Sequence, residues 1–280
     1  MRLIGFHEGG DRWIAAVGPE GTVSRIATAD AFYRDPAAAL AEARRAPAAF
    51  EPHPERAAPT VPATAKVLCV GLNYREHAEE ADARVPEHPT VFGRWESTLV
   101  CDGEAVPVPE VEPGLDWEGE LAVVIGERLT DASEESALRG VLGFTCFNDI
   151  SARQRQFHTT QWTLGKNPDR SGPIGPVLVT ADEWGGPEGW SGRRLTTRLN
   201  GEVVQSGDTA DMIFSVGRIL SYISRTTTLA PGDVVATGTP AGVGFVRTPP
   251  RLLVPGDVVE VEIDGIGVLR NPVVGAEGRS

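Results

Sequence analysis

Short apolar runs separated by turn residues dominate the chain, and this pattern predicts a protein built mainly from strands. Residues 3–6, 13–17 and 23–26 are runs with β-branched and aromatic side chains, which are typical of strands. An Ala-rich stretch at residues 36–48 follows, and its composition favours a helix. Residues 1–60 are therefore predicted to form a small N-terminal α+β domain.

A Pro-rich stretch separates this unit from the rest of the chain. Pro52, Pro54, Pro59 and Pro62 interrupt any regular element and are typical of a linker. The next apolar run, at residues 66–71, has the pattern of a buried strand that ends in a turn. A second, larger domain is therefore predicted over residues 61–280.

The larger domain contains more strand signals than helix signals. The Asn200-Gly201 pair lies between two strand-like runs and predicts a hairpin with a tight turn. Helices are predicted over residues 131–140, which capping residues bound, and over residues 208–225, where apolar residues recur on one face. Regular alternation of strands and helices is missing, which disfavours an all-parallel dinucleotide-binding fold. The predicted class is α+β.

Charge and hydropathy restrict the partners and the compartment. The formal net charge of -13 argues against binding to nucleic acid or to an anionic membrane. No apolar stretch reaches the roughly 18 residues of a membrane-spanning helix, and the N-terminus becomes charged too early for a signal peptide. The cysteines, Cys69, Cys101 and Cys146, lack metal or redox spacing, so we expect free thiols in a cytoplasmic protein.

Three carboxylates follow a pattern that indicates a metal. Glu118 and Glu120 lead into the apolar run at residues 121–125, and Asp149 follows the next apolar run at residues 141–147. If the first run is a strand, both Glu side chains point to one face, about 5–7 Å apart. Two such anions repel each other unless a cation lies between them. The economical interpretation is a site for a hard divalent metal ion.

A candidate acid–base pair lies further towards the N-terminus. His77 and Glu80 are three residues apart, so on a helical turn they face the same side within hydrogen-bond reach. A carboxylate fixes the tautomer of the imidazole and raises its basicity, as a water-activating general base requires. Surface helices carry such pairs by chance, and on spacing alone that explanation is the commoner one.

Lys166 and the glycine-rich segment at residues 237–244 are two further candidates. Lys166 is one of only two lysines and lies in a loop flanked by Gly and Pro. It either performs a task that Arg cannot or is an ordinary surface residue, and the sequence leaves both interpretations open. The glycine-rich segment matches neither nucleotide-binding fingerprint. We expect it to be a tight loop whose backbone N–H groups hold a substrate carboxylate.

Taken in order, these motifs resemble those of the fumarylacetoacetate hydrolase family, over about residues 66–272. No single motif is sufficient, but the ordered set is highly specific. The matching stretches are Gly71-Leu72-Asn73-Tyr74 with His77 and Glu80, then 116–121, 148–153, 162–166, Asn200-Gly201, 212–214, 231–233 and 237–244.

The resemblance implies a fold and a cofactor. The fold is a mixed β-sheet roll that forms the catalytic domain, here residues 61–280, and members are usually homodimers. The cofactor is Mg²⁺ or Mn²⁺, and the positions of its ligands fall on Glu118, Glu120 and Asp149.

The resemblance also implies roles for other residues. His77, Glu80 and Lys166 fall on catalytic positions, and the first two belong to a segment that often closes over the substrate as a lid. The positions near the substrate fall on Tyr74, Arg153, Gln156 and Thr239.

Two positions depart from the family pattern. Many relatives have Lys where this chain has Arg94, and Asp where it has Gln154. We expect both changes to alter the distal part of the substrate pocket rather than the reaction. Asp116 shares the predicted strand face of Glu118 and Glu120, but the resemblance implies no ligand role for it.

The implied reaction is hydrolysis of a C–C bond in a 1,3-diketo acid of the acylpyruvate type. The substrate would chelate the metal, His77 oriented by Glu80 would activate water, and Lys166 and the metal would stabilise the enolate. An oxaloacetate decarboxylase or a 2-hydroxydienoate isomerase would use the same site without attack by water. A catalytically silent metal-binding scaffold is a third hypothesis.

Overall fold

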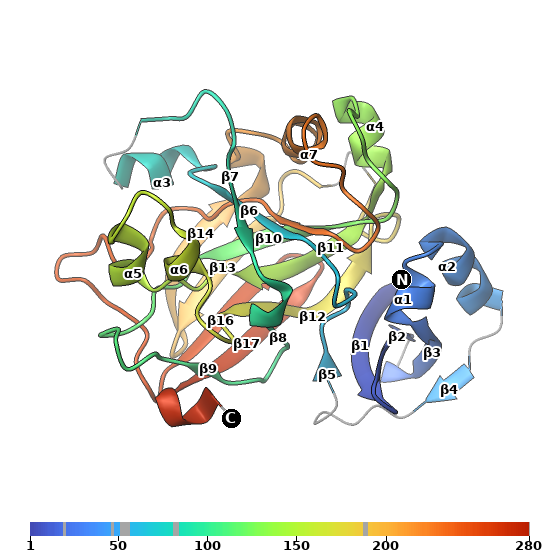
Figure 1. Ribbon diagram of the computed structural model, residues 1–280, viewed down its shortest axis with the longest axis horizontal. Coiled ribbons are helices and arrows are strands. Elements are labelled where there is room, and N and C mark those ends of the chain that lie inside the picture. The colour runs from blue at the N-terminus through green and yellow to red at the C-terminus, as the bar shows by residue number, and fades with distance from the viewer. Residues whose placement is uncertain (19–20, 46–47, 51–56, 81–83, 187–189, 280) are drawn as a thin grey trace.

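The computed structural model describes residues 1–18, 21–45, 48–50, 57–80, 84–186 and 190–279 (Figure 1). Within these ranges the chain forms a sheet of twelve strands, a second sheet of five strands, and short helices around them. Contacts between the two sheets join them into one core. The predicted α+β class with mixed sheets is confirmed.

The larger sheet carries the strands that position the site. Its strand order is β4-β3-β2-β1-β12-β11-β10-β15-β6-β7, with β5 beside β1 and β8 beside β12. The β15–β6 and β12–β8 pairs are parallel and the others are antiparallel. The bounds of its strands are β1 (Arg2–Glu8), β2 (Asp11–Val17), β3 (Val23–Thr28), β4 (Ala48–Phe50), β5 (Ala57–Ala58), β6 (Val67–Gly71), β7 (Thr90–Arg94), β8 (Leu99–Val100), β10 (Gly119–Ile125), β11 (Val141–Asn148), β12 (Gly172–Thr180) and β15 (Val234–Ala236).

The smaller sheet contains the predicted hairpin. Its order is β14-β13-β16-β17-β9. Asn200 and Gly201 form the hairpin turn with φ of 53° and 84°, a left-handed conformation that Asn and Gly tolerate. The bounds of its strands are β9 (Val106–Pro107), β13 (Arg194–Leu199), β14 (Glu202–Asp208), β16 (Val258–Ile263) and β17 (Gly267–Val274).

Strand β10 is buried along its whole length because both of its faces are covered. Leu121 and Val123 belong to the core that the two sheets share, whereas Ala122 and Val124 belong to a core on the opposite face. This alternation follows from the two-residue period of a strand. Glu120 therefore points to the same face of the larger sheet as Ala122 and Val124.

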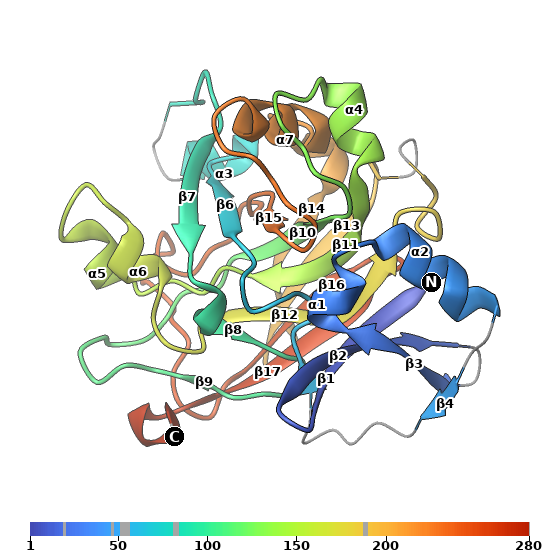
Figure 2. The same cartoon turned by 45° about the vertical axis from the view of Figure 1, so that its right-hand side comes forward.

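The helices lie outside the sheets. Figures 1 and 2 show α1 and α2 beside the N-terminal strands, and α5 and α6 on the opposite side of the molecule. None of the helices in the described ranges combines the length and the apolar character needed to cross a membrane. Their bounds are α1 (Ala29–Phe32), α2 (Pro36–Arg45), α3 (Arg75–Glu80), α4 (Glu134–Arg139), α5 (Arg153–Phe157), α6 (Thr163–Lys166) and α7 (Val216–Ser224).

Two helix predictions had different outcomes. Helix α4 lies within the predicted range 131–140, with Ser133 as its N-cap and Gly140 as its C-cap. The helix predicted over residues 208–225 begins only at Val216, so its predicted start was wrong. Asn73 explains the difference, because its backbone and side chain bind the N–H groups of residues 213 and 214 and hold them outside any helix.

The N-terminal strands extend the larger sheet. Strand β1 pairs with β12 through Arg2–Val179 and Leu3–Leu178. Leu3 packs in the same buried cluster as Phe147 and Leu178. The independent folding of residues 1–60 stays a prediction, and Pro52 and Pro54 of the predicted linker lie outside the described residues.

The shared cluster leads to a test of cooperativity. Leu3→Ala should lower the free energy of unfolding by about 2–5 kcal/mol, because it leaves a cavity between the N-terminal strands and β12. Chemical denaturation should show one transition at a lower midpoint. The exposed Val203→Ala is the matched control and should change little. Two separate transitions would instead indicate that residues 1–60 unfold on their own.

Candidate active site

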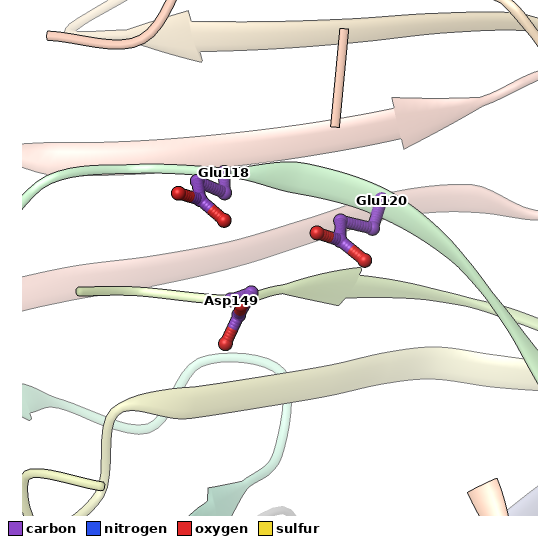
Figure 3. Close-up of side chains that lie close together, drawn as sticks. All are labelled: Glu118, Glu120 and Asp149. Carbon is purple, nitrogen blue, oxygen red and sulfur yellow. The ribbon is translucent and has the colours of Figure 1, made fainter. Parts of the chain in front are cut away.

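The three predicted carboxylates form one buried cluster. One oxygen each from Glu118, Glu120 and Asp149 lies within 4.8 Å of the others. The backbone N–H of Asp149 donates to the carbonyl of Glu118 at 2.9 Å, which brings the end of β11 beside the start of β10. Figure 3 shows both Glu side chains on the same side of one ribbon and Asp149 on its neighbour. The same-face prediction is confirmed.

Cations already accompany two of these carboxylates. The Nζ of Lys166 lies 2.7 Å from Oε2 of Glu118 and 2.7 Å from Oδ2 of Asp149. Arg153 Nη2 lies 2.6 Å from Oε1 of Glu118, and Arg94 pairs with Asp149. Burial alone would raise the pKa of Glu118, but Lys166 and Arg153 outweigh it and lower the pKa to about 2. Glu118 is therefore ionised.

Glu120 lacks such compensation. Among the described residues it forms no ion pair, and one backbone N–H, from Gly238, donates to it at 2.8 Å. Burial raises the pKa of Glu120 well above its usual value, and the charges of Asp149 and Glu118 raise it further. Three converging carboxylate oxygens with one uncompensated member fit a hard divalent cation.

His77 and Glu80 form the predicted pair on α3. Nδ1 of His77 lies 2.8 Å from Oε1 of Glu80. The imidazole is buried, with 8% of the residue exposed, and it lines the same cavity as Glu118 and Glu120. This burial beside the carboxylate cluster excludes the chance surface pair. The other oxygen of Glu80 accepts the N–H of Gly242 at 2.8 Å, which docks α3 on the glycine-rich loop.

A cavity of about 260 Å³ lies beside the carboxylate cluster. Its polar lining contains most of the predicted site residues, namely His77, Glu118, Glu120, Arg153, Gln156, Lys166 and Thr239. Apolar side chains form much of the remaining wall, namely Val70, Leu72, Phe92, Phe157, Trp162, Val243, Phe245 and Val246. The polar groups therefore face a largely apolar enclosure.

Tyr74 is the predicted substrate residue that the fold does not bring to this cavity. It lines a separate polar cavity with Gly207 and Pro240, and its buried hydroxyl has no hydrogen-bond partner among the described residues. Burial, followed by the charge of Glu120, raises the pKa of this phenol. The role of Tyr74 in substrate binding stays a prediction that the geometry does not favour.

The glycine-rich loop binds carboxylates of the protein itself. The N–H groups of Gly238, Gly242 and Gly244 donate to Glu120, Glu80 and Asp116, respectively. These three N–H groups are therefore already engaged, and the binding of a substrate carboxylate by the loop stays a prediction. The hydroxyl of Thr239 donates to the carbonyl of Gly119 and accepts from Gln205, a residue that the sequence analysis missed.

Arg94 and Gln154 do not shape the distal pocket, contrary to our expectation. Arg94 is buried below the cluster, where it donates to Asp149 and to the hydroxyl of Ser171. Gln154 is exposed, and neither residue lines the cavity. Arg94, one of the two departures from the family pattern, therefore contacts the carboxylate cluster instead. Its neighbours in the sequence gave no indication that it would pair with Asp149.

Comparisons with known proteins show the family of this chain. Residues 66–274 match the family model described as fumarylacetoacetate (FAA) hydrolase C-terminal. The chain is 44% identical over 219 residues to the oxaloacetate tautomerase YisK of Bacillus subtilis, an alignment that covers 77% of this chain and 72% of the relative.

Two solved structures share nearly the whole fold. The fumarylacetoacetate hydrolase of Exiguobacterium antarcticum is 34% identical with a TM-score of 0.80, covering 98% of this chain and 99% of that one. The 5-carboxymethyl-2-hydroxymuconate delta-isomerase of Mycobacterium smegmatis is 31% identical with a TM-score of 0.77, covering 98% and 100%. The names of these relatives thus attach three activities to one fold.

The uncompensated Glu120 predicts a pH-dependent stability difference. A group whose pKa is raised by folding stabilises the folded state fully at a pH below its pKa in the unfolded chain. This stabilisation is lost as the pH rises through its pKa in the folded protein. Gln at this position cannot ionise, so Glu120→Gln should escape the loss. In the absence of divalent cations, its Tm should exceed that of the wild type by a margin that grows from about pH 4 to about pH 8.

The exposed Glu135→Gln variant is the control for this experiment and should show no such trend. A margin that stays constant with pH would contradict the assignment of the raised pKa to Glu120.

Proposed function

Because the chain belongs to the fumarylacetoacetate hydrolase family, we propose that it is an enzyme that interconverts the keto and enol forms of oxaloacetate or a closely related 2-oxo acid. The observation that carries this proposal is the position of His77, paired with Glu80, in the same cavity as the carboxylate cluster. The 44% identity to an oxaloacetate tautomerase supports the choice of substrate.

Glu118, Glu120 and Asp149 would hold the Mg²⁺ or Mn²⁺ ion, since hard cations prefer carboxylate oxygens. When bound, the cation would polarise the 2-oxo carbonyl and stabilise the negative charge that develops on its oxygen.

His77 would move the proton. A carboxylate such as Glu80 only accepts hydrogen bonds, so Nδ1 of the neutral imidazole carries the hydrogen and Nε2 holds the free lone pair. Nε2 would take a proton from C3 of the 2-oxo acid, and the C–H electron pair would form the C2–C3 double bond. Return of a proton to the C2 oxygen completes the enol, so atoms and charge balance.

Lys166 would support the developing oxyanion. Burial lowers the pKa of this ammonium group, but Asp149 and Glu118 outweigh burial and raise the pKa overall. The side chain therefore stays cationic inside the cavity. Arg153, Gln156 and Thr239 line the same cavity and would orient the carboxylates of the substrate.

The walls favour proton transfer over hydrolysis. Phe92, Phe157, Trp162 and Phe245 contribute apolar surface to the cavity. Enolisation needs no water molecule as a reactant, whereas hydrolysis needs an ordered one beside His77. An apolar enclosure is thus better suited to the first reaction.

Hydrolysis of an acylpyruvate is the second candidate, and the likeness to a solved fumarylacetoacetate hydrolase favours it. His77 would then activate water instead of removing a proton from carbon. Product analysis separates the activities, because hydrolysis yields two acids, decarboxylation releases CO₂, and tautomerisation or isomerisation conserves mass. Turnover of acylpyruvates with no effect on the enol content of oxaloacetate would replace the first candidate by the second.

Replacing the proposed base should remove catalysis and spare metal binding. We expect His77→Gln to lower kcat for enolisation by roughly 10²–10⁴-fold, the usual contribution of a positioned base. The rate is measured in the reverse direction, ketonisation, which uses the same proton transfer, from the loss of the ultraviolet absorption of the enol of oxaloacetate. The remote, exposed His7→Gln is the control. Undiminished turnover in His77→Gln would exclude the role of His77.

Metal binding has its own test. A cation at about 100 times its Kd should stabilise the folded protein by about 2.7 kcal/mol. Thermal unfolding with and without Mg²⁺ or Mn²⁺ should show this increase in the wild type and not in Asp149→Asn, which lacks one ligand charge. Glu135→Gln is again the control. Full activity after exhaustive chelation would contradict the metal assignment, and metal stabilisation without turnover would leave only a binding scaffold.

A further inference from the structure

Asp116 is fully buried beside the site but does not belong to the metal cluster. Its backbone pairs with Ser151, which places it just ahead of β10. Both of its carboxylate oxygens are already engaged. Oδ1 accepts the N–H of Gly244 at 2.6 Å, and Oδ2 accepts the N–H of Phe245 at 3.1 Å and Nε of Arg153 at 2.8 Å.

The first consequence concerns the orientation of Arg153. Its Nε binds Asp116, its Nη1 donates to Gln156 at 2.9 Å, and its Nη2 lies 2.6 Å from Glu118. Three partners on three nitrogens fix the plane of a guanidinium group. The charges of Glu118 and Asp116 also raise the pKa of Arg153 despite its burial, so it remains a cation. Asp116 thus determines which part of Arg153 faces Glu118.

The second consequence concerns the glycine-rich loop. The backbone of Gly244 packs closely against Asp116. A Cβ at this position would lie 1.9 Å from the carbonyl oxygen of Arg251 and 2.8 Å from Oδ1 of Asp116, so only glycine fits. Val243 and Phe245, on either side of Gly244, line the cavity. The carboxylate of Asp116 therefore binds two parts of the cavity lining. It binds the loop that carries Val243 and Phe245, and it binds the guanidinium of Arg153.

We propose that Asp116 is a positioning residue, which fixes Arg153 and the loop at residues 242–246 against the carboxylate cluster without itself touching substrate or cation. Without the charge of Asp116, Nε of Arg153 loses its ionic partner, so the guanidinium, which already lies 2.6 Å from Glu118, pairs more strongly with that carboxylate and competes with the cation for it. The proposal rests on the proposed metal site for its binding readout and on the proposed reaction for its kinetic readout.

A double-mutant cycle of Asp116→Asn and Arg153→Gln tests this role in the full-length protein. The first readout is the Kd of Mn²⁺, titrated by electron paramagnetic resonance without substrate. The second is the KM and kcat for oxaloacetate. We expect Asp116→Asn to weaken Mn²⁺ binding and to raise KM, each about 10–100-fold, with a smaller change in kcat. In the Arg153→Gln background the same substitution should change the Kd less than about threefold, because the competing cation is gone.

Asp233→Asn is the matched control. Asp233 is also buried, accepts two backbone N–H groups, from Lys66 and Ala230, and pairs with a cation, the Lys66 ammonium. It does not line the cavity. Both Asn variants should lose thermal stability, but Asp233→Asn should keep the wild-type Mn²⁺ affinity and KM.

Several results would overturn the proposal. One is that Asp116→Asn weakens Mn²⁺ binding equally with and without Arg153, and another is that Asp233→Asn weakens it as much. The other two are that the wild type binds no Mn²⁺, and that Asp116→Asn leaves the amide hydrogen exchange of Gly244 and Phe245 unchanged. If the wild type turns over no oxo acid but the Mn²⁺ cycle gives the expected coupling, the proposed function fails and the role of Asp116 stands.

Discussion

The need to compensate buried negative charge organises this protein. A buried carboxylate is costly unless it is paired or hydrogen-bonded, and its pKa otherwise rises until it is neutral. Four such groups lie together here, namely Asp116, Glu118, Glu120 and Asp149. The described residues place three buried cations among them, namely Arg94, Arg153 and Lys166. Glu120 is left without one, and this imbalance is the physical reason to expect a bound cation.

The sheet brings these charges together because two antiparallel strands end side by side. Strand β10 supplies Glu120 from a position that alternation directs to one face, and β11 delivers Asp149 next to Glu118. Both strands are covered on both faces and the three carboxylates are themselves buried, so bulk water screens their charges poorly. Of the compensating cations, Arg94 ends β7 of the same sheet, and the other two come from outside it. Arg153 comes from α5 and Lys166 from α6.

One glycine-rich loop connects the separate parts of the site. Its backbone N–H groups bind the uncompensated cluster member Glu120, the orienting carboxylate Glu80 and the positioning carboxylate Asp116. The arrangement of base, cluster and cavity wall therefore depends on the conformation of one segment. Relatives with hydrolase, tautomerase and isomerase names share this fold, so the fold by itself does not decide the activity.

The sequence by itself determined the features that depend on neighbours along the chain. Strand alternation put Glu118 and Glu120 on one face, the helical period brought His77 to Glu80, and the Asn200-Gly201 turn fixed a hairpin. Only the tertiary structure decided which distant groups meet. The partners of Asp116, of Arg94 and of the loop N–H groups lie up to 162 residues away, and Asn73 shortened a helix from across the chain. Local spacing carries no information about such pairs, because packing of the whole core selects them.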